Sequence, residues 1–361
     1  MANGKQPRGG PTIEALRKAL GRVEDPELHK DLISLNMIHD LKVEDGRVSF
    51  ALVLTTPACP LRERIAADAR AAVESVPGVS EVRIRMDASV PGGIPAGTVA
   101  ISVRNVIAVA SGKGGVGKST IAVNLAVSLA RSGSCVGLLD ADIYGPNIPT
   151  MMGVSELPAP QEERIFPASA HGVKVISIGL MVEPGRPLVW RGPMLHSAIR
   201  QLLTDVEWGE LDYLIVDLPP GTGDVQISLG QLVRLTGGII VTLPQKVARE
   251  DALRGLEMFK MMDVPILGVV ENMSYWTGPD GTPVDLFGRG GGRELADQAA
   301  VPFLGEIPID PNVRIGGDSG KPVVLSAPES PVAVALKEMA EKIAARISVV
   351  ALQGGPGSSK N

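Results

Sequence analysis

The chain of 361 residues contains only two cysteines, Cys59 and Cys135. Two thiols exclude a disulfide framework, and they also exclude a zinc or iron–sulfur site with four cysteine ligands from one protomer. Aromatic residues make up only 3% of the sequence, which argues against the stacking platforms that bind single-stranded nucleic acid. No apolar run reaches the roughly 18 residues of a membrane span.

Charge of neither sign dominates the sequence. The net charge is −5 and the sequence pI is about 5.6, so no global field attracts the chain to nucleic acid or to an anionic membrane. The first ten residues contain no apolar signal core,. We therefore expect a cytoplasmic protein with no nucleic-acid partner and no membrane partner.

The N-terminal part of the sequence predicts a small α+β domain over residues 11–88. Two strand patterns are joined by an Asp-Gly pair, Asp45-Gly46, which is typical of a hairpin,. The segment 89–102 is rich in proline and glycine and breaks every periodicity, so it predicts a linker,. The helical patterns are 13–20 and 62–76, and the strand patterns are 38–43, 47–54 and 79–86.

From residue 103 onward, apolar strand patterns alternate with helical ones. This alternation predicts an α/β domain over residues 103–350 with a doubly wound parallel sheet. The last helical pattern, 331–348, has acids as well as bases on its polar face, which favours packing on the sheet over a membrane anchor,. We expect the tail, 351–361, to be disordered. The strand patterns are 105–110, 136–140, 173–178, 213–217, 238–243, 266–271 and 303–307.

A glycine-rich loop lies between the first of these strands and a helical pattern. Its sequence, Gly-Lys-Gly-Gly-Val-Gly-Lys-Ser, fits G-x-x-x-x-G-K-[ST], the P-loop that surrounds a polyphosphate with backbone N–H groups,. Lys118 is expected to reach the β- and γ-phosphates and the Ser119 hydroxyl to hold Mg²⁺. The sequence thus predicts ATP and Mg²⁺ as cofactors, bound by Gly112, Lys113, Gly114, Gly115, Val116, Gly117, Lys118, Ser119 and Thr120.

The same loop also fits a weaker dinucleotide-binding motif. Gly112, Gly114 and Gly117 spell G-x-G-x-x-G, and Asp140 ends the next strand where a ribose-binding acid would stand,. That interpretation leaves Lys118 and Ser119 without a task, because a pyrophosphate at a helix N-terminus needs neither an ammonium group nor a hydroxyl for magnesium. The triphosphate interpretation is favoured.

Two further strands end in acids at the edge where ligands bind in parallel sheets. Asp217 can orient Mg²⁺ through water, and the turn that follows, 219–221, can move with the γ-phosphate as a switch. Asp142 can orient an attacking water while Asp140 supports the metal shell. The alternatives are helix capping by Asp217 and loop capping by one of the other two acids.

Lys113 stands inside the glycine run, where the general motif requires no lysine. A cation can be supplied to a transferring phosphoryl group from another molecule, as an arginine finger does. Lys113 can therefore serve the facing subunit of a dimer. The alternative is a second, local phosphate contact.

With these residues the chain resembles the Mrp family of P-loop ATPases, which are relatives of chromosome-partitioning ATPases, division-site regulators and the nitrogenase iron protein. Lys113 matches the family's additional lysine, Asp142 its first switch and Asp217 its second. The resemblance implies a homodimer in which Asn272 contacts adenine and Pro308 and Asp310 border the base. The stretches that match this branch most closely are 139–147, 190–194, 217–224 and 271–274.

The first domain resembles an iron–sulfur-assembly domain that is often fused to this ATPase. The matching stretch is 55–60, with Cys59 as its cysteine. A thiol in a turn just before a helix can be stabilised as thiolate by the helix N-terminus, and the alternative is an inert, half-buried cysteine. Cys135 opens a strand and is expected to be a small core residue.

The family implies an iron–sulfur cluster carrier that uses ATP to deliver clusters to apo iron–sulfur proteins. Members usually carry Cys-x-x-Cys shortly after the stretch 271–274, whereas this chain has no cysteine in 275–288. A cluster would then be bound at Cys59, by the partner, or by non-thiolate ligands. The alternatives are a metal-free dimeric ATPase that positions or regulates a partner, and a small-molecule kinase.

Overall fold

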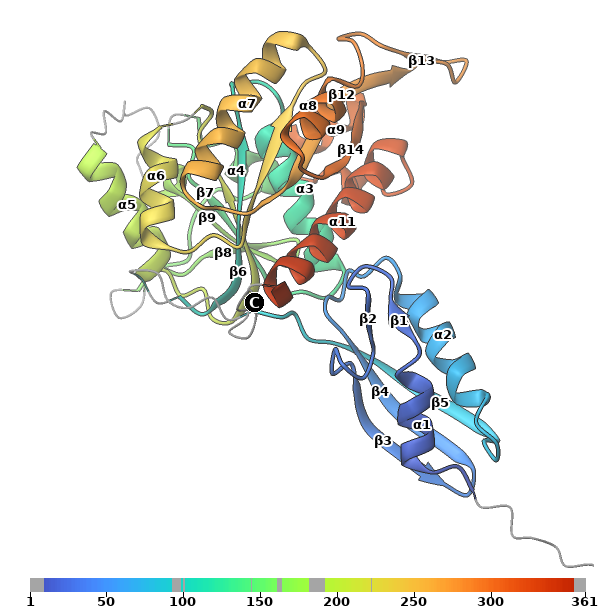
Figure 1. Ribbon diagram of the computed structural model, residues 1–361. Coiled ribbons are helices and arrows are strands. Elements are labelled where there is room, and N and C mark those ends of the chain that lie inside the picture. The colour runs from blue at the N-terminus through green and yellow to red at the C-terminus, as the bar shows by residue number, and fades with distance from the viewer. Residues whose placement is uncertain are drawn as a thin grey trace, which may run out of the picture. The chain divides into compact units, whose positions relative to one another are not determined.

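Figure 1 shows the computed structural model of the protein, which divides into two compact units, Met1–Pro91 and Gly92–Asn361. The structure describes residues 10–92, 99, 101–143, 145–160, 164–181, 192–221 and 223–353. The tail residues 354–361, half of the predicted linker (93–98 and 100) and part of the stretch 190–194 lie outside this part of the chain.

The first unit is a three-stranded sheet with two helices. Strands β3 (Ile38–Glu44) and β4 (Arg47–Leu54) are antiparallel, and β4 pairs in parallel with β5 (Glu81–Ala88). Helix α2 (Arg62–Glu74) makes the crossover between β4 and β5 and packs with α1 (Ile13–Leu20). The core side chains come from both helices and the sheet and include Leu16, Leu20, Phe50, Ile65 and Val73.

The predicted hairpin between β3 and β4 is confirmed. Asp45 and Gly46 have φ values of 48° and 79°, the left-handed pair that a two-residue hairpin turn requires,. Two strands of two residues each, β1 (Glu24–Asp25) and β2 (Lys30–Asp31), were not predicted. They are too short for a period-2 pattern to be visible in the sequence.

In the second unit, nine described strands form one sheet in the order β13-β12-β11-β6-β10-β7-β9-β8, with β14 paired to β12. All neighbouring strands are parallel except at two short strands, β8 and β13, where the pairing is antiparallel, so the predicted doubly wound parallel sheet is confirmed with two antiparallel additions. The strands are β6 (Val103–Ser111), β7 (Val136–Asp140), β8 (Ala168–Ala170), β9 (Val173–Ser177), β10 (Leu211–Asp217), β11 (Gly237–Thr242), β12 (Ile266–Thr277), β13 (Pro283–Val284) and β14 (Phe303–Ile309).

The two antiparallel exceptions have local causes. The chain reverses between β8 and β9 through His171 and Gly172, with φ values of 54° and 80°, which is again a left-handed two-residue turn,. Strand β12 continues six residues beyond the predicted end at 271, and its extension pairs through Trp276 with Val284 of β13. An edge extension of this kind depends on a pairing partner and not on local hydrophobicity.

Helices cover both faces of this sheet (Figure 1). Alternation along β6 sends Val106 and Ala108 into a core formed with α5, α6, α7 and α8, and leaves the other face to α3 and α11, which pack against each other,. The helices are α3 (Lys118–Arg131), α4 (Ile148–Met152), α5 (Gly192–Thr204), α6 (Asp224–Leu232), α7 (Lys246–Met261), α8 (Gly291–Ala299), α9 (Pro311–Asp318), α10 (Val323–Ser326) and α11 (Pro331–Gln353), with a 3₁₀ turn, η1 (Ile178–Leu180).

Helix α11 corresponds to the pattern 331–348, for which the sequence favoured packing on the sheet and left a membrane anchor as the alternative. Its side chains Val332, Leu336, Ile343 and Ile347 are fully buried in the second unit, so the prediction of a packed helix is confirmed. It includes residues 351–353, which the sequence had assigned to the tail. Within the described ranges, no helix is long and apolar enough to cross a membrane.

Candidate functional site

The candidate site lies at the carboxyl ends of three adjacent parallel strands, β6, β10 and β7. In the sheet register, Asp217 at the end of β10 stands opposite Val109 of β6 on one side and Asp140 of β7 on the other. The glycine loop leaves β6 after Ser111 and enters α3 at Lys118. Residues that are far apart in the sequence therefore meet at one edge of the sheet, as the predicted topology requires.

Glycines of the loop are needed for backbone conformation and for close approach. Gly115 and Gly117 have φ values of 79° and 85°, which side chains other than glycine rarely adopt. A Cβ on Gly117 would lie 2.1 Å from Nδ2 of Asn272, and a Cβ on Gly112 would lie 2.1 Å from the backbone carbon of Asp251 in α7. The loop is thus packed directly against β12 and α7.

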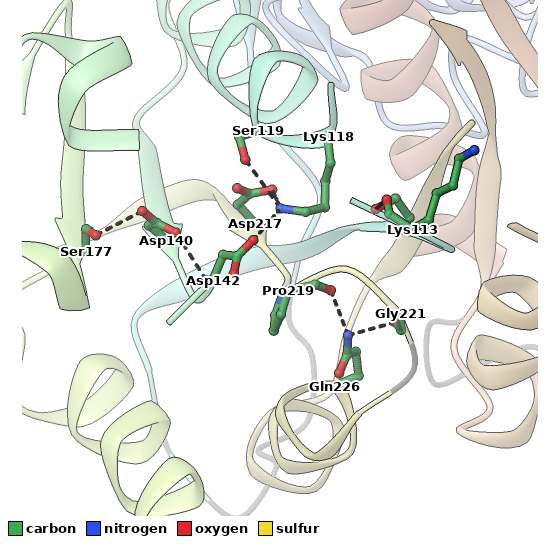
Figure 2. A network of polar contacts seen from close by, with 11 residues as sticks. Lys113, Lys118, Ser119, Asp140, Asp142, Ser177, Asp217, Pro219, Gly221 and Gln226 are labelled. Atoms are coloured by element: carbon green, nitrogen blue, oxygen red, sulfur yellow. Dashed lines mark hydrogen bonds and ion pairs between the residues drawn. The ribbon is translucent and has the colours of Figure 1, made fainter. Parts of the chain in front are cut away.

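Lys118 is the centre of an ionic cluster beneath the loop (Figure 2). Its Nζ donates to Oδ1 of Asp217 at 2.6 Å and lies 3.6 Å from Oδ2 of Asp142 and 3.4 Å from the Ser119 hydroxyl. The side chains of Lys118 and Asp217 are 6% and 0% exposed. This ammonium group, which the sequence assigns to phosphates, neutralises two buried carboxylates in this structure.

Asp217 fits a magnesium ion held through water. Burial raises the pKa of its carboxyl, while the charge of Lys118 and hydrogen bonds from Lys118 and Ser119 oppose that rise. Oδ2 of Asp217 is buried and has no hydrogen-bond partner among the described residues. A carboxylate oxygen without a partner, next to the Ser119 hydroxyl, is a donor set of the kind that Mg²⁺ prefers.

Asp140 and Asp142, the two acids after β7, are both buried but face different partners. Asp140 accepts from the Ser177 hydroxyl at 2.9 Å and from the backbone N–H of Asp142 at 3.1 Å, whereas the Asp142 carboxylate faces Lys118. Burial raises the pKa of Asp140 to about 7, and the charge of Asp217 adds to the rise. Asp140 therefore supports the loop from beneath, and only Asp142 reaches the ionic cluster.

The raised pKa of Asp140 predicts a pH-dependent stability. The folded protein keeps a proton on Asp140 that an unfolded chain, with the ordinary pKa of 3.8, has released. Since the folded state binds more protons, this residue's contribution to the free energy of unfolding falls as pH rises from about 4 to about 7 and then levels off. Asp140→Asn is expected to remove this fall.

Urea unfolding of wild type and Asp140→Asn at pH 5 and pH 8 checks the prediction. Tryptophan fluorescence is a suitable probe because all three tryptophans, Trp190, Trp208 and Trp276, lie in the second unit. The difference in the free energy of unfolding, Asp140→Asn minus wild type, should be more positive at pH 8 than at pH 5. An equal pH dependence in the two proteins would show that Asp140 ionises normally in the fold.

The loop and the ionic cluster open into a cavity of about 780 Å³. Asn272 lies at its wall and donates from Nδ2 to the Val116 carbonyl at 2.8 Å, while Asp310 caps α9 by accepting from the Asn312 N–H at 2.7 Å. The structure thus brings the phosphate and base residues together. Of the predicted residues, the cavity is lined by Lys113, Gly114, Gly115, Gly117, Lys118, Ser119, Thr120, Asp142, Asn272, Pro308 and Asp310.

Three predicted residues stand behind this lining. Gly112 is packed on α7, Val116 is 2% exposed, and Asp217 lies under Lys118. Lys113 is at the cavity, but its side chain points away from Lys118 and Asp217 (Figure 2).

Sequence reasoning missed two buried polar residues of the site. Glu271, the residue before Asn272 in β12, accepts from the Ser274 hydroxyl and from the N–H groups of Gly290 and Gly292, so it caps α8. Gln226 in α6 binds the loop after Asp217. The only sequence signal for Gln226 is its place three residues after a helix start, the capping-box position.

The two cysteines belong to different units. Cys59 is half-buried in a turn before α2 and packs against the core of the first unit. Cys135 is exposed, so its assignment as a small core residue was wrong: it precedes the first buried residue of β7. Its backbone N–H donates to the Asp212 carboxylate, and its carbonyl accepts from the Asp212 and Tyr213 N–H groups. Within the described ranges, no three His, Cys, Asp or Glu side chains gather as metal ligands.

Comparison with known proteins decides the family. Residues 102–344 match the family described as NUBPL iron-transfer P-loop NTPase. The chain belongs to this family of P-loop NTPases. Residues 13–84 match a second family, described as iron–sulfur cluster assembly protein, so the predicted pair of domain types is confirmed. As a P-loop NTPase, this chain binds and hydrolyses nucleotide.

Two bacterial relatives that match nearly the whole chain carry the same name. The iron–sulfur cluster carrier protein of Synechocystis sp. is 51% identical over 350 residues, covering 94% of this chain and 99% of that protein. The iron–sulfur cluster carrier protein of Deinococcus radiodurans is 52% identical over 346 residues, covering 95% and 98%.

Among solved structures, the ADP complex of a nucleotide-binding protein from Archaeoglobus fulgidus is 39% identical, with a TM-score of 0.55. The match covers 61% of this chain and 88% of that one.

Proposed function

We propose that this NTPase is an ATP-hydrolysing iron–sulfur cluster carrier that delivers clusters to apoproteins. The observation that carries the proposal is similarity to named carriers over 94% of the chain, through both units. A nucleotide switch without a cargo domain would match only over the second unit. The first unit, which matches the iron–sulfur cluster assembly family, would therefore act in the same ATP-dependent cycle of cluster delivery as the P-loop unit.

ATP binding would begin by exchanging the partners of Lys118. Its ammonium group would leave Asp217 for the β- and γ-phosphates, which offer the same charge-assisted hydrogen bonds. Ser119 and the freed Asp217 would then hold Mg²⁺, whose charge offsets that of the phosphates. Asp142, 3.6 Å from Lys118 Nζ, is placed to orient the attacking water.

The base would lie between β12 and α9. Asn272 commits its Nδ2 donor to the loop carbonyl of Val116, so its Oδ1 remains to accept from an amino group, which adenine has and guanine lacks at the corresponding position,. Pro308 and Asp310 border this end of the cavity. This geometry favours ATP over GTP.

A homodimer would complete the site. Lys113 is at the cavity but points away from the ionic cluster of its own protomer (Figure 2). A lysine in that position can serve the γ-phosphate of a facing subunit, as a finger residue supplied in trans does. The other partners would be apo iron–sulfur proteins.

Cys59 is the cluster ligand that this chain offers. Its turn is fixed by backbone hydrogen bonds from Cys59 N–H to Thr56 and from Arg62 N–H to Cys59, both 3.3 Å. The thiol stands two residues before Leu61, the N-cap of α2, where the helix dipole stabilises thiolate,. One thiol per protomer can only be part of a ligand set, which a partner or a non-thiolate group would complete.

Anaerobic reconstitution with iron and sulfide tests the cargo. Wild type is expected to gain visible cluster absorption and Cys59→Ala to lose most of it, because the remaining thiol, exposed Cys135, belongs to the other unit. Cys135→Ala is the matched control and should behave as wild type. Equal binding by wild type and Cys59→Ala would remove Cys59 as ligand. Binding by neither would favour the metal-free ATPase switch.

A further inference from the structure

Gln226 is a buried side chain whose amide binds only the loop that follows Asp217. It lies in the first turn of α6 and is 1% exposed. Its Nε2 donates to the Pro219 carbonyl at 2.9 Å and to the Gly221 carbonyl at 3.0 Å, and its Oε1 accepts from the Gly223 N–H at 2.9 Å. Figure 2 shows the amide facing Pro219 and Gly221.

The loop held in this way is joined to the P-loop by backbone contacts. Gly221 has a φ of 88° and donates its N–H to the carbonyl of Ser111 at 2.9 Å. The Ser111 hydroxyl donates to the carbonyl of Lys113 at 3.0 Å. A continuous line of hydrogen bonds therefore runs from α6 through Gly221 to the backbone of Lys113.

These contacts keep the Gly221 amide away from a nucleotide. A backbone N–H that donates to Ser111 cannot donate to a γ-phosphate at the same time. Three loop groups also depend on this one side chain, and one of them, the Pro219 carbonyl, is buried. A buried polar group left without a partner costs about 1–3 kcal/mol. The positions of Pro219, Gly221 and Gly223 are thus set by Gln226 more than by the loop's own sequence.

We propose that Gln226 is a positioning residue that holds Pro219, Gly221 and Gly223 in place and thereby fixes their linkage to the P-loop. The inference rests on the proposed ATPase cycle, in which this loop meets the γ-phosphate. Gln226 holds the loop at Pro219 and at Gly223. Between these two points, the Gly221 N–H exchanges its hydrogen bond to the Ser111 carbonyl for one to the γ-phosphate. Gln226 acts through the loop and does not touch the nucleotide.

Gln226→Glu replaces a single heavy atom, the Nε2 nitrogen, by an oxygen, and so exchanges the donor for an acceptor. A carboxylate can still accept from the Gly223 N–H, but it places a negative oxygen against the Pro219 and Gly221 carbonyls. When the introduced carboxyl is protonated it can donate again, and burial raises its pKa. The variant should therefore regain part of the native hydrogen bonds at low pH. A side chain that only fills space at this position would show no such pH dependence.

Hydrogen exchange in the nucleotide-free protein is the first measurement. The amides of Leu218, Gly221 and Gly223 in Gln226→Glu are expected to exchange at least about 10-fold faster than in wild type at pH 8, a difference that corresponds to about 1.4 kcal/mol of lost protection. The difference should shrink at pH 5.5. Gln226→Met, which can neither donate nor accept, should show the faster exchange at both pH values. Gln201→Glu, on an exposed position of α5, is the matched control.

ATP turnover and ADP affinity are the second pair of measurements. Displacement of a catalytic loop by about 1 Å can cost 100-fold in rate, so kcat in both Gln226 variants is expected to fall about 10- to 100-fold. The Kd for ADP, which lacks a γ-phosphate, should stay within about twofold of wild type, since a twofold change is only about 0.4 kcal/mol.

Two results would overturn the proposal. Native exchange at Leu218, Gly221 and Gly223 in both variants would show that Gln226 does not hold the loop. Equal losses of kcat, ADP affinity and unfolding midpoint would assign it a general structural role. Failure of the proposed carrier function would give a different result. Wild type would then not transfer clusters, whereas the hydrogen-exchange differences between wild type and the Gln226 variants would remain.

Discussion

Lys118→Ala is expected to abolish ATP turnover, with a loss of more than about 1,000-fold, since removal of one uncharged transition-state donor already costs up to that much. The ammonium group lies at the cavity beneath the loop, and its Nζ is held 2.6 Å from Asp217 and 3.6 Å from Asp142. Its loss removes phosphate binding and leaves both carboxylates without their counter-ion. Steady-state phosphate release and nucleotide titration measure the two effects.

The same substitution also threatens the fold, so the test needs a folded comparison. Removing one partner of a buried ion pair costs about 3–5 kcal/mol. Lys118→Met combined with Asp217→Asn removes both charges of the 2.6 Å pair and keeps the volumes similar, so it should restore the unfolding midpoint without restoring turnover. Turnover in that double variant would contradict the assigned role of Lys118.

Lys113→Ala is expected to lower kcat about 1,000-fold, the lower end of the effect of a finger residue supplied in trans, while ADP affinity stays near that of wild type. The reason is that the side chain points away from Lys118 and Asp217 of its own protomer (Figure 2). Turnover per protomer in wild type should rise with protein concentration as dimers form. An equal loss of nucleotide binding in Lys113→Ala and Lys118→Ala would remove the case for action in trans.

Subunit mixing makes this test sharper. Lys113→Ala and Asp142→Asn should each be inactive alone. In a mixed dimer, the Lys113→Ala protomer keeps its own Asp142 and receives Lys113 from its partner, so one of the two sites is complete. A 1:1 mixture should therefore recover about a quarter of wild-type turnover, because half of the randomly formed twofold dimers are mixed. No recovery would show that both residues act within one protomer.

Most elements of the fold could be predicted because each is encoded locally. The hairpin at Asp45-Gly46 follows from a turn that needs two left-handed residues, and both have that conformation. The P-loop was predicted from eight consecutive residues, and α3 begins at Lys118 within it. The short strands β8 and β13 could not be predicted, since three or two residues carry no periodicity and form only against a partner strand,.

The functional residues divide along the same line. Lys113, Lys118, Ser119 and Asp217 were predicted because their motifs fix both residue type and spacing. Gln226 and Glu271 were missed because a glutamine or glutamate acquires a role only from what surrounds its buried side chain. Cys135 was assigned wrongly because its apolar neighbours suggest burial, whereas it stands just outside the buried strand.

By itself, the sequence determined that this chain carries a P-loop on a parallel sheet, preceded by a domain of the iron–sulfur-assembly type. Only the tertiary structure decided that Lys118 is neutralised by Asp217, 99 residues away, that Asp140 holds its proton up to a pH of about 7, and that Gln226 fixes the loop between α6 and the P-loop. The physical reason is range. Motifs and periodicities are local, whereas ion pairing, desolvation and the satisfaction of buried amides depend on which strand ends the register of the sheet brings together.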